Sequence, residues 1–225
     1  MTPRLSLLRA LAVTAVAALL LPLVPAQSLI VGRVPAGLDQ DADVVAEARL
    51  ALAWFPVELG RGSVDADGAF VLRFHHPLPL AREVGIGVQR LFADLRCDDL
   101  QLSDPDARVV LVRDLRVIPD GAPCEYCETL AWLSFGTRPR DAHPATGDLE
   151  LQWIHSDRAL RVSGLCHYGW GTETYALELH AGWNTLLLET VVVHPSEGYC
   201  DCRDVVVREV SAFPDGLAWH LLPQR

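Results

Sequence analysis

Short apolar segments separated by turn-forming residues run along most of the chain, and they predict strands. In residues 49–55 the side chains alternate between two faces, although residues 46–53 alone would also suit a helix. The other predicted strands cover residues 28–34, 109–118, 129–135, 149–154, 159–166, 174–179, 185–193, 205–210 and 217–222, and residues 63–72 are predicted to form a hairpin. Strands at near-regular spacing, with little helix between them, indicate an all-β fold. We therefore predict an antiparallel β-sandwich.

Three turns in this pattern predict hairpins. Asp67-Gly68 provides the positive φ that a tight turn between short strands needs. His155 to Arg158 separates two strand-like segments, and Ala181 to Asn184 separates two more. In the last of these turns, Gly182 or Asn184 would take the left-handed conformation.

The least regular part of the chain covers residues 77–106, where 84–95 would suit either a helix or a strand. We place a domain boundary near residue 107. The expected units are an N-terminal β domain at residues 27–107 and a cysteine-containing β-sandwich domain at residues 108–225.

Two segments resemble known families. The Asp67-Gly68 hairpin follows the Gly-Arg-Val and Ala-Leu-Ala-Trp segments, and residues 28–76 are similar to carboxypeptidase-regulatory, or transthyretin-like, domains. The segment Tyr175 to Leu188 resembles a hairpin of uncharacterised exported bacterial β-sandwich proteins. These resemblances imply a fold and a location, and neither implies an activity.

The N-terminus has the form of a signal peptide at residues 1–26. Arg4 and Arg9 precede an apolar run at residues 11–21, and Val24-Pro25-Ala26 provides a small-residue cleavage site. The run is shorter than the roughly 20 residues of a membrane-spanning helix. We expect export to the periplasm, cell envelope or medium, with no membrane span in the mature chain; a retained N-terminal anchor is the alternative.

Charge narrows the range of partners. The chain has a net charge of −10, and all its basic residues are arginine. Cleavage after Ala26 removes two arginines and no acids, which leaves −12. An acidic chain argues against nucleic acid and anionic membranes as partners. An envelope protein or a glycan remains as the expected partner.

Two cysteine pairs bracket the second half of the chain. Cys124 and Cys127 open this segment, and Cys200 and Cys202 close it. In an exported chain an even set of six cysteines favours disulfides, for which Cys97 and Cys166 are further candidates. The alternatives for the two pairs are a tetrahedral zinc or copper site and a redox Cys-x-x-Cys.

Two tryptophans beside turn glycines, Trp170 and Trp183, are candidates for surface binding. Trp132 and Trp153 lie within predicted strands and are expected in the core. His155-Ser156-Asp157 contains the residue types of a catalytic triad, but neighbours in sequence form a turn more readily than a triad.

No catalytic residues are therefore assigned. We expect a non-enzymatic envelope or extracellular binding or structural protein without a cofactor. A zinc- or copper-binding protein is the alternative.

Overall fold

The computed structural model describes residues 29–35, 41–49, 56–74, 85–93, 95–121, 129–169, 171–194 and 202–222. Its elements are β1 (Leu29–Arg33), β2 (Ala42–Arg49), β3 (Pro56–Ser63), β4 (Ala69–Phe74), β5 (Ile86–Gly87), α3 (Val88–Leu91), β6 (Arg96–Leu102), β7 (Arg108–Val112), β8 (Leu115–Pro119), β9 (Ala131–Gly136), β10 (Leu149–Ser156), β11 (Leu160–Tyr168), β12 (Gly171–Leu179), β13 (Gly182–Val193), β14 (Arg203–Val210) and β15 (Ala218–Leu222). The prediction of an all-β chain is confirmed.

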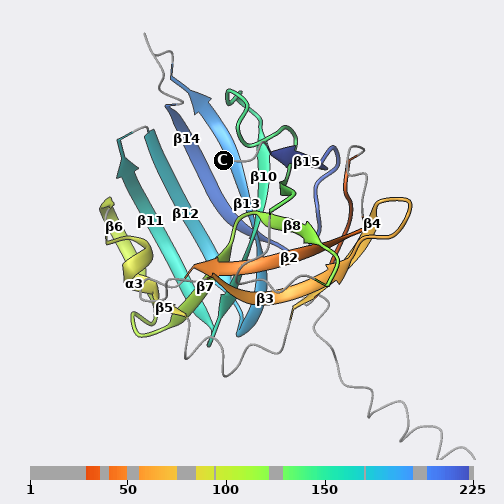
Figure 1. The fold of residues 1–225 in the computed structure, drawn as a ribbon. Helices are drawn as coiled ribbons and strands as arrows, with labels where there is room; N and C mark the ends of the chain where they lie inside the picture. Colours follow the sequence, from red (N-terminus) through yellow and green to blue (C-terminus); the bar gives the residue numbers. More distant parts are fainter. Residues whose placement is uncertain are drawn as a thin grey trace, which may run out of the picture.

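Hydrogen bonds connect the described strands into one open sheet. Its main path runs β1-β4-β3-β2-β8-β9-β10-β13-β14-β12-β11-β6, with β15 paired to β9 and β7 paired to both β10 and β5. The sheet is mixed because β12 and β14 are parallel. Figure 1 shows β6, β11, β12, β14 and β13 as one curved surface, with β2 and β3 crossing in front of it. The sandwich arrangement itself stays a prediction.

Two strands in the middle of this path, β10 and β13, contribute to two separate apolar cores. Trp153 and Trp183 pack into one core with side chains of β1, β2, β4, β7, β8 and β9. Ile154 and Leu186 point to the opposite face of these strands. They pack into the other core with α3, β11, β12 and β14. Because successive side chains of a strand point to opposite faces, one strand pair can hold both cores together.

The residues on the two sides of the expected boundary near 107 are hydrogen-bonded to one another. Strand β8 pairs with β2 from Ala42 to Ala46, and Leu115 and Val117 share a core with Val44. The boundary stays a prediction, but the described strands on either side of it form one sheet and one of the two cores.

The Asp67-Gly68 hairpin is confirmed. Gly68 has φ +79°, and β3 and β4 pair in antiparallel fashion on either side of the turn. The Asp65 carboxylate accepts hydrogen bonds from the backbone N–H groups of Asp67 and Ala69 at 2.9 and 2.8 Å, which fixes the turn.

The hairpin expected around Ala181 to Asn184 is wrong, because β14 lies between β12 and β13. The Asn184 side chain accepts a hydrogen bond from the His180 N–H at 2.9 Å and donates to the His180 carbonyl at 3.0 Å. These are the backbone groups that a tight hairpin would pair across the strands. With them satisfied locally, the strands separate and β14 fills the gap.

The hairpin expected around His155 to Arg158 is wrong as well. Strand β11 pairs with β12 and β6, whereas β10 pairs with β13, β7 and β9. The turn bonds to β7 instead: Asp157 donates its N–H to the Arg108 carbonyl, and its carboxylate accepts the Arg108 N–H at 2.9 Å. Anchored in this way, the chain leaves β10 and starts β11 in another part of the sheet.

Two further expectations change in detail. The single strand predicted at residues 109–118 is interrupted at Arg113-Asp114 and forms β7 and β8. A strand is also found at Ala42–Arg49, ahead of the strand predicted at residues 49–55, and residues 50–55 lie outside the described ranges. None of the helical segments in the described part of the chain has the length and apolarity needed to cross a bilayer.

Candidate functional site: an apolar cavity with a charged mouth

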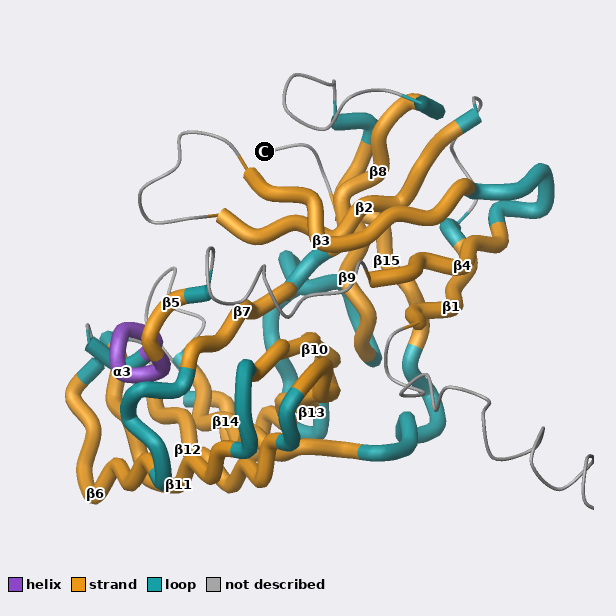
Figure 2. The backbone as a smooth tube through the Cα atoms, turned by 90° about the horizontal axis from the view of Figure 1, so that it is seen from below, coloured by secondary structure: helices purple, strands orange, loops and turns teal. Residues whose placement is uncertain are grey.

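A cavity of about 130 Å³ lies on the inner face of the curved sheet, where α3 and β7 cover β10 to β14. Figure 2 shows α3 and β7 above the strands β11, β12 and β14. Its apolar walls consist of Val88, Leu91, Phe92, Leu111, Ile154, Leu160, Val162, Leu177, Leu179, Leu186, Leu188 and Val207.

Strand alternation directs these side chains inward. On β12 the residues Leu177 and Leu179 are buried while Glu178 between them is exposed, and β14 contributes the buried Val207 to the same face. The short helix α3 presents Val88 and Leu91 from one side, since residues three apart in a helix share a face. The roof and floor of the cavity are therefore both apolar.

The other described residues of the lining are polar, and we call them the mouth of the cavity. They are Arg113, Arg140, Glu150, Gln152, Glu173, Tyr175 and Arg203. Arg140 is paired with two carboxylates, since its Nη1 lies 2.8 Å from Asp114 Oδ2 and its Nε 3.6 Å from Glu150 Oε1. Burial opposes the charge of Arg140, but these two carboxylates outweigh it and raise its pKa.

A second polar contact joins Tyr175 to Glu173. The Tyr175 hydroxyl donates a hydrogen bond to the Glu173 carboxylate, and its ring packs edge-on against Phe92 with the centroids 5.0 Å apart. Burial, together with the negative charge of Glu173, raises the pKa of Tyr175 well above its ordinary value. Tyr175 is therefore a neutral donor that keeps the Glu173 carboxylate at the edge of the cavity.

Two arginines at the mouth have no carboxylate within ion-pair distance among the described residues: Arg113 and Arg203. Arg113 is exposed at the end of β7, and Arg203 begins β14. The one side-chain hydrogen bond of Arg203 in the described ranges is a long contact of 3.5 Å to the Thr190 hydroxyl. Their guanidinium groups thus retain donors that no described carboxylate occupies.

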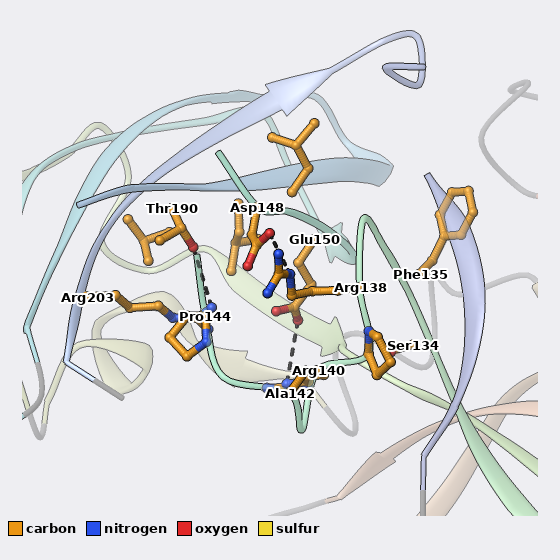
Figure 3. Close-up of a pocket in the computed structure, with 14 residues that line it drawn as sticks. Ser134, Phe135, Arg138, Arg140, Ala142, Pro144, Asp148, Glu150, Thr190 and Arg203 are labelled. Carbon is orange, nitrogen blue, oxygen red and sulfur yellow. Dashed lines mark hydrogen bonds and ion pairs between the residues drawn. The ribbon is translucent and has the colours of Figure 1, made fainter. Parts of the chain in front are cut away.

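A smaller pocket of about 30 Å³ adjoins the mouth and shares Arg140, Glu150, Leu188 and Arg203 with the main cavity. Figure 3 shows Arg138 beside Asp148, and Arg140 beside Glu150, on the wall of this pocket. Arg138 Nε lies 2.8 Å from Asp148 Oδ1. This pocket is about large enough for a water molecule, and it extends the polar rim rather than the apolar volume.

Among the predicted cysteines, Cys97 and Cys166 form a disulfide. They face each other in the register of β6 and β11, so the bond ties the edge strand β6 to the floor of the cavity. Cys202 is disulfide-bonded as well. The other three cysteines of the two pairs lie outside the described residues: Cys124, Cys127 and Cys200.

Surface binding by Trp183 is wrong. Only 4% of this residue is exposed, and its ring stacks on Phe74 with the centroids 3.8 Å apart. Because the strand after Gly182 directs Trp183 into a core, proximity to a turn glycine did not indicate exposure. Trp153 is buried as predicted, and Trp170 lies outside the described ranges.

His155, Ser156 and Asp157 do not form a catalytic triad in the structure. The Ser156 hydroxyl donates to the Arg158 carbonyl at 2.6 Å, and the Asp157 carboxylate binds Arg158 and the Arg108 N–H. Within the described ranges, no group of three or more His, Cys, Asp or Glu side chains is placed to hold a metal ion.

Comparisons of the chain with protein families, with curated proteins and with solved structures find no match. The cavity is therefore the feature from which a function can be inferred. Its residues were not identified from the sequence, where the apolar ones read as ordinary core positions and the charged ones as surface positions. The alternation of buried and exposed residues in β12 was visible, but alternation does not distinguish a filled core from a hollow one.

Proposed function

We propose that the protein is an exported, disulfide-stabilised, non-enzymatic binding protein that holds a small, largely apolar molecule in the cavity beneath α3. The observation that carries the proposal is the cavity itself, about 130 Å³ of space with apolar walls and a polar mouth. Ligand sites are typically such concave, mainly apolar spaces with a few polar groups that orient the ligand.

The size of the cavity indicates the size of the ligand. An engineered apolar cavity of about 150 Å³ is known to hold one benzene molecule. A group of about six carbon atoms therefore matches the space beneath α3. At about 0.8 kcal/mol for each buried methylene, it would contribute roughly 5 kcal/mol, which corresponds to a Kd near the millimolar range.

The chemistry of the lining favours binding over catalysis. Among the described residues, the side chains around the cavity include no serine, threonine, cysteine or histidine. These are the side chains that most often act as nucleophiles or bases. The acidic and phenolic groups at the mouth are already bonded to one another or to Arg140 and Gln152.

The proposal of export is supported by the signal-like segment at residues 1–26 and by the Cys97–Cys166 bond, since disulfides persist mainly in oxidising compartments. A zinc or copper site formed by the two cysteine pairs, Cys124/Cys127 and Cys200/Cys202, would require thiolates. Cys202 is held in a disulfide and offers none.

The test is a calorimetric titration with 1-hexanol and with benzene, using the mature chain with its disulfides intact. We expect saturable binding near the millimolar range. Leu111→Trp, which fills the cavity from β7, should weaken binding at least tenfold. Leu221→Trp is the matched control, because Leu221 packs against the other core. Binding that is absent in the wild type, or that Leu111→Trp leaves unchanged, would refute the proposal.

A further inference from the structure

We propose that the ligand of this cavity is a small monocarboxylate, whose apolar part fills the space beneath α3 while its carboxylate binds Arg113 and Arg203. This inference rests on the proposed function. It adds the chemical class of the ligand and the two residues that select it.

The three arginines at the mouth differ in their carboxylate partners. Arg140 already has two carboxylates, Asp114 and Glu150. Arg113 and Arg203 have no carboxylate within 4.0 Å among the described residues, although both line the cavity. Guanidinium groups bind carboxylates in a planar, two-pronged geometry, and such charge-assisted hydrogen bonds are stronger than neutral ones.

The positive charge of Arg113 and Arg203 contrasts with the chain as a whole, which carries −10. Each of the two arginines acts electrostatically on a tyrosine. Tyr175 experiences the charge of Arg113, and Tyr168 experiences the charge of Arg203. An anion that enters the cavity would therefore meet favourable charge only at its rim.

The charged side chains of the lining limit the charge of the ligand. Among the described residues they are Arg113, Arg140, Glu150, Glu173 and Arg203. Asp114, which pairs with Arg140, balances the third cation, so the mouth as a whole accepts little added negative charge. A dianion such as a phosphate monoester would place its second charge near Glu150 and Glu173, where like charges repel. The balance of charges thus favours a monoanion.

The two arginines share one cavity with apolar side chains. Both belong to the same cavity lining as Val162 and Leu177, so a short amphiphile would reach the apolar walls and a guanidinium together. Tyr175 and Gln152 supply additional polar contacts at the rim. The carboxylate would remain near solvent, where the cost of removing it from water is small.

The experiment compares hexanoate, 1-hexanol and hexylamine, which share one chain length and differ in the head group. Binding is measured by calorimetry at pH 7.5 in low salt, on the mature chain with its disulfides intact. Hexanoate should bind about tenfold more tightly than 1-hexanol, and hexylamine should bind most weakly. The preference for hexanoate should shrink in 0.5 M sodium chloride, because Arg113 is exposed and salt screens its charge.

Variants then assign the preference to residues. Arg113→Gln and Arg203→Gln should each raise the Kd of hexanoate about tenfold and leave that of 1-hexanol within twofold. Arg90→Gln is the matched control, since Arg90 is an exposed arginine on α3 outside the cavity lining. It should bind both ligands as the wild type does.

The outcomes separate the two proposals. If 1-hexanol binds and hexanoate binds no more tightly, or if Arg90→Gln has the same effect as Arg113→Gln, the assignment of a carboxylate ligand is overturned while the cavity remains a binding site. If none of the three compounds binds, the proposed function fails and this inference fails with it. If hexylamine binds best, the acids of the mouth select the ligand, and our assignment to the arginines is wrong.

Discussion

His155 lies in surroundings that do not suit a charged imidazole ring. Its side chain is fully buried, its ring meets Trp183 edge-on at 5.3 Å, and no described residue forms a hydrogen bond with either ring nitrogen. Burial lowers the pKa of His155 from its ordinary 6.5 to about 4, although the charge of Asp157 opposes this shift. The neutral ring is therefore the form that the folded protein accepts.

Stability should consequently depend on pH through His155. Between about pH 6.5 and 4 the unfolded chain binds a proton at this residue and the folded chain does not. The part of the free energy of unfolding that depends on the neutral His155 ring is fully present above pH 6.5. It decreases as the pH falls toward 4, by at most about 3 kcal/mol. Urea unfolding of the wild type and of His155→Leu, each at pH 7 and pH 4.5, measures the difference.

His155→Leu should be clearly less sensitive to acid than the wild type. At pH 7 the substitution should change stability little, because it removes two polar atoms that have no partner. The same dependence on pH in both proteins would show that other groups cause it.

At the scale of single elements, the parallel contact between β12 and β14 depends on one glycine. Gly171 has φ +147°, and a Cβ added there would lie 1.8 Å from the carbonyl oxygen of Arg203. Every residue with a Cβ would push β14 away at the point where Arg203 reaches the mouth of the cavity. This contact therefore links the geometry of the sheet to that of the proposed site.

Gly171→Ala should destabilise the protein by roughly 2–4 kcal/mol, because it combines a backbone clash with a strained φ. Gly169→Ala is the control two residues away, since a Cβ there meets no atom within 4 Å. Thermal unfolding followed by circular dichroism compares the two variants. Equal melting temperatures for both would show that β12 and β14 separate without cost.

At the scale of the whole molecule, the two cores share strands β10 and β13 back to back. Neither core can lose these strands without exposing the other. The Cys97–Cys166 bond strengthens the outer edge of the second core by closing a separation of 69 residues. In the chain-entropy account, a loop of this length contributes roughly 4 kcal/mol.

We therefore expect the mature chain to unfold in one transition under non-reducing conditions. Leu72→Ala in the first core and Leu177→Ala in the second should each lower the same melting temperature, at a cost of about 2–5 kcal/mol. Differential scanning calorimetry measures this directly. Two separate transitions, each shifted by one variant, would instead support independent domains divided near residue 107.

Local sequence patterns determined the class of the fold and many of its elements. Apolar segments of strand length, with turn residues between them, predicted β9, β10, β11 and β14 close to their bounds. The Asp67-Gly68 turn could be recognised because its conformation depends on a positive φ at Gly68 and on hydrogen bonds from a neighbouring carboxylate. These interactions act within a few residues, so the sequence displays them directly.

Which strands lie side by side was decided only by the tertiary structure. Both hairpins predicted in the second half were wrong, because Asn184 bonds the backbone of His180 and Asp157 anchors its turn to Arg108 of β7. The burial of Trp183 and the hollow beneath α3 likewise depend on segments far apart in the chain. A strand's periodicity shows that one face is apolar, but it cannot show whether that face meets a side chain or an empty space. That difference is set by how α3 and β7 close over the sheet.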